Sequence, residues 1–257
     1  MIVELLARTQ LIREVAERLG YVSHAPGTVT DGDELAEVAG RECYQSWHRP
    51  NAGTAHNTGY VGNIINHKHF SVLEHSQFTF SIRNVSRALT HELVRHRHLS
   101  PSQESQRYVD VSDGTVIVPP ELIPFLESSP WDLVLADDHH ESIARYNSIV
   151  EMLTEAGVPR KRARQAARYA LPNGHATRLV ISGNVRAWRG FLEKRASRDP
   201  LTGQPHADLE IFDLACRILC ILHEEVPNSV QDLWAEHVRW SQASDHDGEP
   251  MLSRSQL

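Results

Sequence analysis

The sequence contains few of the residues that several common classes of protein need. Only three of its 257 residues are cysteine, and no two of them form a Cys-x-x-Cys pair. Three cysteines cannot build a disulfide framework, so we expect a reducing, cytoplasmic compartment. No stretch approaches the roughly 18 consecutive apolar residues of a membrane-spanning helix, so we expect no membrane partner. Glu4, so early in the chain, predicts that the first residues are not a signal peptide.

Motifs for dinucleotides and metals are also missing. The chain has no Gly-x-Gly-x-x-Gly and no Gly-x-x-x-x-Gly-Lys-Ser/Thr, so a doubly wound nucleotide-binding sheet is not indicated. Sixteen histidines require that a metal site be considered. The nearest zinc-protease frame begins at His91, but the cation Arg95 stands four residues later, and His96 lies about 100° further around a helix. We therefore expect no metal site, and a metal-dependent hydrolase is a minor alternative.

Covalent catalysis has little support in this chain. No Gly-x-Ser-x-Gly elbow is present. Cys216 and Cys220 lie four residues apart in an apolar helical segment and are expected in the core, while Cys43 has no adjacent base. Ser105 is a nucleophile by type but lacks a clear base, so we assign it the role of a hydrogen-bond donor. A chain that binds polar groups without reactive side chains is typical of an enzyme that uses a cofactor.

The charge is acidic overall but basic in one segment. A formal net charge of −7 and an estimated pI of 6.1 argue against a nucleic-acid partner. The segment 95–108 nevertheless holds three arginines, two histidines, three serines and two glutamines. Guanidinium groups match phosphate oxygens in pairs, which favours an anion site over a solvated basic face. Arg168 and Arg195 lie near the ends of predicted helices and are further candidates, whereas a solvated helix face explains Arg164, Arg178, Arg189 and Arg198 equally well.

Hydrophobic periodicity predicts a mixture of helices and strands. We expect Asp33 to cap a helix, and Asn184 to cap another that begins at Val185. Pro101 predicts that a helix ends before it and that a loop follows. The strands are expected at 2–7, 70–82, 116–118 and 179–181. Helices are expected after Asp33 and at 54–67, 85–97, 143–153, 161–171, 185–195 and 207–223.

These elements alternate without a βαβ rhythm. We therefore predict an α+β fold with a mixed or antiparallel sheet flanked by helices. No linker or internal repeat divides the sequence, so residues 1–240 are expected to form a single domain. Residues 241–257 are polar and are expected to be a disordered tail.

Several motifs, taken in order, resemble those of the flavin-dependent thymidylate synthases. Arg95-His96-Arg97 followed by Ser105 resembles the Arg-His-Arg signature of that family, which precedes a serine by seven or eight residues. The likeness covers roughly residues 35 to 235. Besides this signature, the likeness includes motifs at residues 69–75, 86–87, 91–94, 164–172, 184–186, 191, 195–197 and 206–211.

The resemblance implies an α+β homotetramer that holds FAD between subunits. Such enzymes are methyltransferases of dTMP biosynthesis: they convert dUMP to dTMP, with the carbon from methylenetetrahydrofolate and with NADPH reducing the flavin. They work without a cysteine nucleophile, which agrees with the unremarkable cysteines of this chain. The alternative from another class is a non-catalytic module that binds nucleotides or RNA through the same arginines.

The resemblance also implies roles for individual residues. Arg195 corresponds to a catalytic arginine that polarises the uracil, and a guanidinium there would stabilise charge developing on a carbonyl oxygen. The residues implied to bind FAD are Ser71, Arg95, His96, Arg97, Gln103, Asn184, Arg186 and His206. Those implied to bind dUMP are Arg87, Glu92, Arg95, Gln103, Glu104, Ser105, Gln106, Arg107, Arg168 and Arg195.

Three departures from the family pattern accompany this likeness. Glu92 stands where many members have glutamine, and Gly190 stands where asparagine or histidine is common. Residues 198–205 resemble an insertion before His206.

Overall fold

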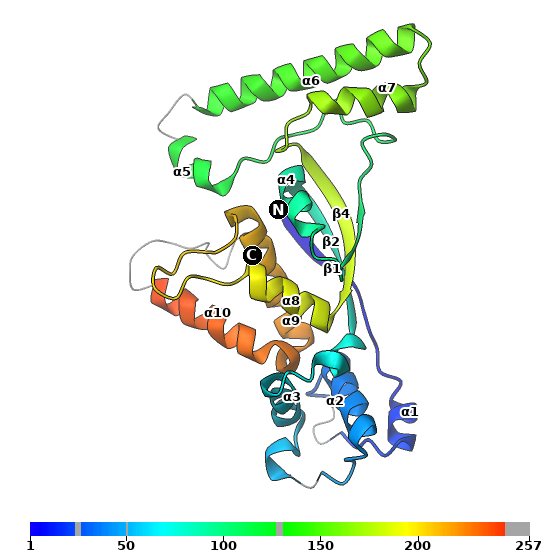
Figure 1. Cartoon of the computed structure of the whole chain (residues 1–257), viewed down its shortest axis with the longest axis vertical. Coiled ribbons are helices and arrows are strands. Elements are labelled where there is room, and N and C mark those ends of the chain that lie inside the picture. The colour runs from blue at the N-terminus through cyan, green and yellow to red at the C-terminus, as the bar shows by residue number, and fades with distance from the viewer. Residues whose placement is uncertain (24–26, 50, 127–130, 245–257) are drawn as a thin grey trace. The chain divides into compact units, whose positions relative to one another are not determined.

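The chain folds into two compact units, each assembled from separate stretches of sequence (Figure 1). The computed structural model describes residues 1–23, 27–49, 51–126 and 131–244. Unit 1 comprises 1–2, 81–95 and 101–180, and unit 2 comprises 3–80, 96–100 and the chain from Ile181 onward. Within the described residues, no helix is both long and apolar enough to span a membrane.

Four strands form one sheet in the order β1-β2-β4-β3. They are β1 (Ile2–Arg8), β2 (Gln77–Ser86), β3 (Ser100–Gln103) and β4 (Ala176–Asn184). β2 and β4 are antiparallel, because Arg87 N–H donates to the His175 carbonyl near one end and Val185 N–H donates to the Ser76 carbonyl near the other. The prediction of an α+β fold with an antiparallel sheet is confirmed at this level.

Unit 1 contains a long helical hairpin. Its two helices lie side by side (Figure 1) and enclose a small apolar cluster around Val111, Tyr146 and Ala167. The hairpin consists of α6 (Trp131–Glu155) and α7 (Arg160–Ala167), and a 3-10 turn, η4 (Arg168–Ala170), follows it. The other helices of this unit are α4 (Arg87–Leu93), η3 (Pro120–Leu122) and α5 (Ile123–Leu126).

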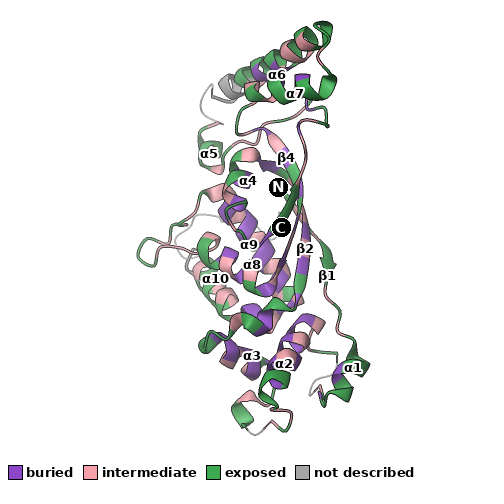
Figure 2. Cartoon of the chain, turned by 45° about the vertical axis from the view of Figure 1, so that its right-hand side comes forward, coloured by how far each residue is buried: buried purple, intermediate pink, exposed green. Residues whose placement is uncertain are grey.

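Unit 2 holds the larger apolar core. Trp188 is fully buried and meets both Phe80 and Phe191 edge to face. Figure 2 shows buried residues along α9 (Leu209–Glu225), as the three- and four-residue spacing of its apolar side chains predicts. The remaining helices are α1 (Arg13–Arg18), α2 (Asp31–Tyr44), η1 (Ala52–Thr54), α3 (Asn57–Asn66), η2 (Phe70–Glu74), α8 (Val185–Arg195), η5 (Pro227–Val230) and α10 (Gln231–Ser244).

Asp33 does not cap its helix as the sequence predicts. Thr30 is the N-cap residue of α2, and its side chain accepts a hydrogen bond from the Asp33 N–H. The Asp33 carboxylate is fully buried and instead accepts hydrogen bonds from Asn228 N–H and from the backbone and hydroxyl of Ser229. It therefore joins the start of α2 to a turn almost 200 residues later. Burial raises the pKa of Asp33 to about 6, although these hydrogen bonds lower it in part.

Several other boundaries differ from the sequence-based expectations. Residues 100–103 are strand β3 rather than loop, because Pro101 lies in an edge strand of the sheet, where a missing N–H is tolerated. Residues 70–74 form a 3-10 turn, and β2 begins only at Gln77. The expected strand at 116–118 makes one isolated bridge, from Val116 to His175.

Helix ends and the tail also differ. The expected helix 85–97 is shorter: the Ser86 side chain caps it by accepting from Leu89 N–H, and it ends at Leu93. Of the proposed tail, 241–244 belong to α10, and 245–257 lie outside the described residues.

Cys216 and Cys220 are only partly buried, and burial raises the pKa of Cys216 to about 12, so this thiol is not ionised at neutral pH.

Asp33→Asn should destabilise the fold in a pH-dependent way. An amide N–H₂ would face the N–H donors of residues 228 and 229, which costs about 1–3 kcal/mol. The folded pKa of about 6 lies above the unfolded value, so the stability contributed by this carboxyl is lost as the pH rises through 6. The gap in unfolding free energy between wild type and variant should therefore shrink by about 1 kcal/mol from pH 5 to 7.5.

Denaturant unfolding at the two pH values measures this gap. The chain's histidines titrate equally in both proteins and cancel in the difference. If the unfolding free energies of wild type and variant changed with pH by the same amount, the Asp33 carboxyl would not contribute the predicted pH dependence.

Candidate active site

Two arginines of unit 1 lie close enough for their charges to repel each other. Arg87 is the first residue of α4, and Arg168 directly follows α7. Burial, and then the charge of Arg168, lower the pKa of Arg87, while Glu104 opposes this in part. Arg87 Nη1 is buried and makes no hydrogen bond in the described part of the chain. Two adjacent guanidinium groups, one with an unsatisfied donor, fit a phosphate.

The segment after β3 adds further donors to the same unit. Glu104 N–H donates to the Arg178 carbonyl, and the Glu104 carboxylate pairs with the Arg178 side chain at 3.0 Å. Gln106 Nε2 and Arg107 Nε are buried and lack hydrogen-bond partners among the described residues. Unit 1 thus contains most of the residues that the resemblance assigns to dUMP, and it leaves several of their donors unsatisfied.

In unit 2, α8 ends beside His96. Arg195 Nε donates to His96 Nε2 at 3.1 Å, so His96 must be neutral there, with its proton on Nδ1. The imidazole meets Phe191 edge to face, with 5.0 Å between ring centroids. Phe191 is fully buried, one helical turn before Arg195. A packed ring and a hydrogen bond together orient the Arg195 side chain.

Two predicted cofactor residues lie at the start of α8, and a third lies on a segment that packs against this helix. η2, which carries Ser71, packs against α8, and the Arg186 side chain pairs with Glu74 at the end of η2. Asn184 caps α8 by accepting from Ala187 N–H, as predicted. Asn184 therefore has a structural role whether or not it also meets a ligand.

Arg95 and Arg97, in contrast, are exposed. Neither guanidinium group has an ion-pair partner within the described ranges of the chain. His98 beside them is exposed as well.

The insertion 198–205 is an ordered hairpin. Arg198 and Pro205 pair as an antiparallel bridge, and Arg198 also donates to the Gly203 carbonyl at 2.8 Å. The tip is exposed, as expected, with Leu201 at 94%. The hairpin returns the chain so that His206 Nδ1 lies 3.3 Å from Ser197 Oγ.

The structure shows the partners of several arginines for which the sequence leaves both a ligand site and a solvated helix face open. Arg164 pairs with Asp110, and Arg178 pairs with Glu104. Arg189 is buried and binds both carboxylate oxygens of Asp232, at 2.7 and 2.8 Å. These three arginines already have acidic partners, whereas neither Arg87 nor Arg168 forms an ion pair with another described residue.

Comparison with known proteins shows the family of this chain. The model of the family described as thymidylate synthase complementing protein matches residues 27–228. The chain belongs to this family. Flavin-dependent thymidylate synthase of Mycobacterium avium (strain 104) is 47% identical over 200 residues, which cover 76% of this chain and 77% of that protein. The enzyme of the same name from Mycobacterium marinum is 44% identical over 224 residues, 84% and 83% of the two chains.

Family membership confirms the prediction from the Arg95–Ser105 motif and its companions. The individual ligand contacts inferred from the family stay predictions. At one departure, Gly190, an added Cβ would meet no atom within 4 Å. A Cβ at this position of α8 would therefore meet no steric obstacle.

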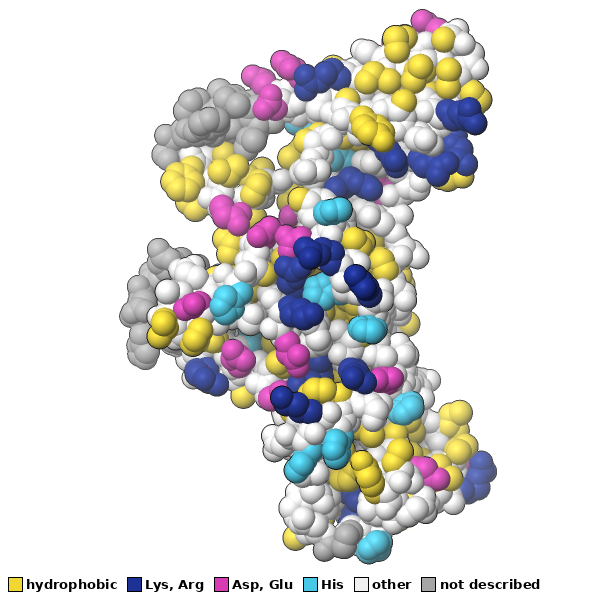
Figure 3. Space-filling model, in the orientation of Figure 1, with side chains coloured by type: hydrophobic (Ala, Val, Ile, Leu, Met, Phe, Trp, Pro, Cys, Tyr) yellow, Lys and Arg dark blue, Asp and Glu magenta, His cyan; other side chains and the backbone are white. Residues whose placement is uncertain are grey.

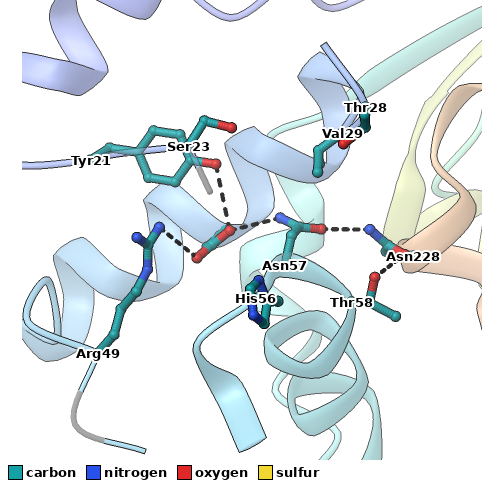
Figure 4. Close-up of a pocket in the computed structure, with 10 residues that line it drawn as sticks. Tyr21, Ser23, Thr28, Val29, Arg49, His56, Asn57, Thr58 and Asn228 are labelled. Carbon is teal, nitrogen blue, oxygen red and sulfur yellow. Dashed lines mark hydrogen bonds and ion pairs between the residues drawn. The ribbon is translucent and has the colours of Figure 1, made fainter. Parts of the chain in front are cut away.

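Unit 2 of this family member also has a polar cavity that the sequence does not predict (Figure 4). Its volume is about 290 Å³. The buried Glu37 carboxylate lies on its wall and pairs with Arg41 at 2.7 Å, with Arg49, and with Asn57 Nδ2 at 2.9 Å. The lining residues are Tyr21, Ser23, Thr28, Val29, Glu37, Arg49, His56, Asn57, Thr58 and Asn228, and none of them is a predicted site residue.

Glu37→Gln should destabilise the protein strongly. Arg41 is 1% exposed, and removal of its carboxylate partner leaves a buried charge uncompensated. Such losses typically cost about 3–5 kcal/mol. Glu42→Gln, at an exposed position of the same helix, is the control and should change stability by less than about 0.5 kcal/mol. Chemical denaturation compares the two variants, and equal stabilities would show that the Glu37 network does not support the fold.

Proposed function

We propose that this protein is a flavin-dependent thymidylate synthase. In this proposal it methylates dUMP to dTMP, with methylenetetrahydrofolate as carbon donor and NADPH as reductant. The observation that carries the proposal is the Arg87–Arg168 pair, in which the two charges repel each other and Arg87 Nη1 is buried without a hydrogen-bond partner among the described residues. Family membership and the names of the relatives support the same activity.

The nucleotide is assigned to unit 1. Its phosphate would bind Arg87 and Arg168, because a dianion satisfies both guanidinium groups and removes their mutual repulsion. The unsatisfied donors of Gln106 and Arg107 are available to the same ligand. The remaining residues of unit 1 assigned to dUMP are Glu92, Arg95, Gln103, Glu104 and Ser105, and the family resemblance adds Arg195, which belongs to unit 2.

The residues present also fit a flavin dinucleotide. Its pyrophosphate is anionic, and the exposed guanidinium groups of Arg95 and Arg97 lack ion-pair partners among the described residues. We assign FAD to these two residues and to Ser71, His96, Gln103, Asn184, Arg186 and His206. Bound FAD would supply the hydride-transfer chemistry that no side chain of this protein provides.

Arg195 is proposed as the catalytic residue. A guanidinium beside the uracil carbonyl stabilises negative charge that develops on that oxygen. The hydrogen bond to His96 holds Arg195 before the substrate arrives, so less orientation is required during the reaction. We extend the proposal to a homotetramer with active sites shared between subunits, located in the cytoplasm.

A non-catalytic nucleotide- or RNA-binding module is the rival function. On the face shown in Figure 3, Lys and Arg side chains form small groups with Asp and Glu between them. One such group lies over α7, whose sequence is rich in basic residues. Together with a net charge of −7, this distribution differs from the continuous basic surface typical of RNA binding.

The proposed function is tested by supplying purified protein with FAD, dUMP, methylenetetrahydrofolate and NADPH. We expect a yellow protein that oxidises NADPH faster when dUMP is present and that forms dTMP. A colourless protein that neither takes up added FAD nor forms dTMP would falsify the proposal.

Arg168→Ala should weaken the binding of dUMP. Loss of one charge-assisted contact to phosphate costs about 1.5–3 kcal/mol, so KM for dUMP should rise by about 10- to 100-fold. The KM for NADPH should change little, because Arg168 is not assigned to that substrate. Arg162→Ala removes an exposed arginine of the neighbouring α7 and serves as the matched control. Steady-state kinetics with each substrate varied would show the difference, and an unchanged dUMP KM in Arg168→Ala would place the phosphate elsewhere.

A further inference from the structure

Gln103 is held by two threonines that the sequence does not single out. It is the last residue of β3, and its Nε2 donates to Thr90 Oγ1 at 3.1 Å and to Thr177 Oγ1 at 3.3 Å. Thr90 belongs to α4 and Thr177 to β4, and each is 4% exposed. The amide group is therefore fixed between a helix and the neighbouring strand of the sheet, all within unit 1.

The direction of these hydrogen bonds decides which end of the amide faces the threonines. Thr90 Oγ1 donates its single proton to the Arg87 carbonyl at 2.9 Å. Toward Gln103 this hydroxyl can then only accept, so Gln103 must present its NH₂ group to it. The carbonyl oxygen Oε1 consequently points to the opposite side of the amide.

Gln103 Oε1 accepts no hydrogen bond from any side chain or backbone group in the described part of the chain. The unsatisfied polar groups near it in sequence, Arg87 Nη1, Gln106 Nε2 and Arg107 Nε, are all donors. The carboxylate next to it in sequence, Glu104, is paired with Arg178. Gln103 Oε1 is thus an acceptor without a partner among the described residues, in a unit where several donors are unsatisfied.

This acceptor does not suit the phosphate of a nucleotide. A phosphate dianion carries only acceptor oxygens, and a carbonyl oxygen facing it would be repelled. A ligand group that binds to Oε1 has to be a donor, such as a hydroxyl or a ring N–H. A deoxyuridine nucleotide carries both kinds of donor, away from its phosphate.

We propose that Thr90 and Thr177 are positioning residues that hold Gln103 Oε1 toward the substrate, where it accepts a hydrogen bond from a hydroxyl or ring N–H of the nucleotide. The inference rests on the proposed function, because it assumes a nucleotide in unit 1. Without the two hydroxyls the amide is free to turn by 180° and to present its NH₂ group to a donor of the substrate.

Threonine variants of matched shape test this role. The valine pair Thr90→Val with Thr177→Val keeps the branched shape and removes both hydroxyls, while the serine pair Thr90→Ser with Thr177→Ser keeps both hydroxyls. We expect Kd and KM for dUMP to rise about tenfold in the valine pair, the equivalent of one hydrogen bond. The serine pair should stay within about threefold of wild type, and kcat at saturating dUMP should change little in either pair.

Inorganic phosphate is the second probe. Arg87 and Arg168 are expected to bind it without Gln103, so its affinity should be the same in wild type, the valine pair and the serine pair. If the valine pair folds poorly, Thr177→Val alone serves, because the Thr177 side chain makes no other hydrogen bond within the described residues and valine favours a strand. It should give a smaller loss in the same direction, and Thr177→Ser should restore affinity.

The outcomes separate this inference from the proposed function. Valine and serine variants that bind dUMP equally well, or equally badly, overturn the positioning role. A parallel loss of phosphate affinity in the valine variants also overturns it, because the effect would then be a general disturbance of unit 1. If wild type forms dTMP in these cases, only the positioning role has failed; if wild type binds no dUMP, the proposed function fails with it.

Discussion

The repulsion between two half-buried guanidinium groups is the constraint on which the candidate site depends. Arg87 is placed by the start of α4, and Arg168 by the turn that follows α7. Keeping two like charges close and partly removed from water raises the free energy of the folded chain. A bound dianion attracts both guanidinium groups and offsets their mutual repulsion. Part of the affinity for the ligand therefore comes from the relief of this repulsion.

Several other buried charges among the described residues are paired with an opposite charge. Glu37 binds Arg41 and Arg49, and Arg189 binds Asp232 through two hydrogen bonds. Such pairs are expected, because an isolated buried charge is costly and a paired one is tolerated. The Arg87–Arg168 pair differs from these ion pairs because two like charges meet, and such an arrangement is typical of a site whose counter-charge arrives with the ligand.

The sequence predicts those features that depend on neighbours along the chain. The alternation in β2 and the bounds of α8 follow from local periodicity and from the Asn184 cap, and the motifs around Arg95 identify the family. Features that depend on distant partners are not predictable in this way. Asp33 resembles a helix cap until Ser229 is seen beside it, and Arg189 resembles a surface residue until Asp232 is placed.

In the candidate site, too, the features that depend on distant partners cannot be predicted from the residues alone. Arg87 and Arg168 are 81 positions apart, so their meeting is visible only in the fold, although the family resemblance names both. The roles of Thr90 and Thr177 have no sequence signal at all, because a buried threonine in a helix or strand is ordinarily structural. Only the direction of the Thr90 hydrogen bond distinguishes them.

Calorimetric titration with dUMP and with deoxyuridine, which lacks the phosphate, tests the central claim most directly. If Arg87 and Arg168 form the phosphate site, removal of the phosphate should weaken binding by at least about 100-fold, the equivalent of two charge-assisted contacts. Equal affinities for the nucleotide and the nucleoside would contradict the account, because the two arginines would then have no anionic ligand to bind.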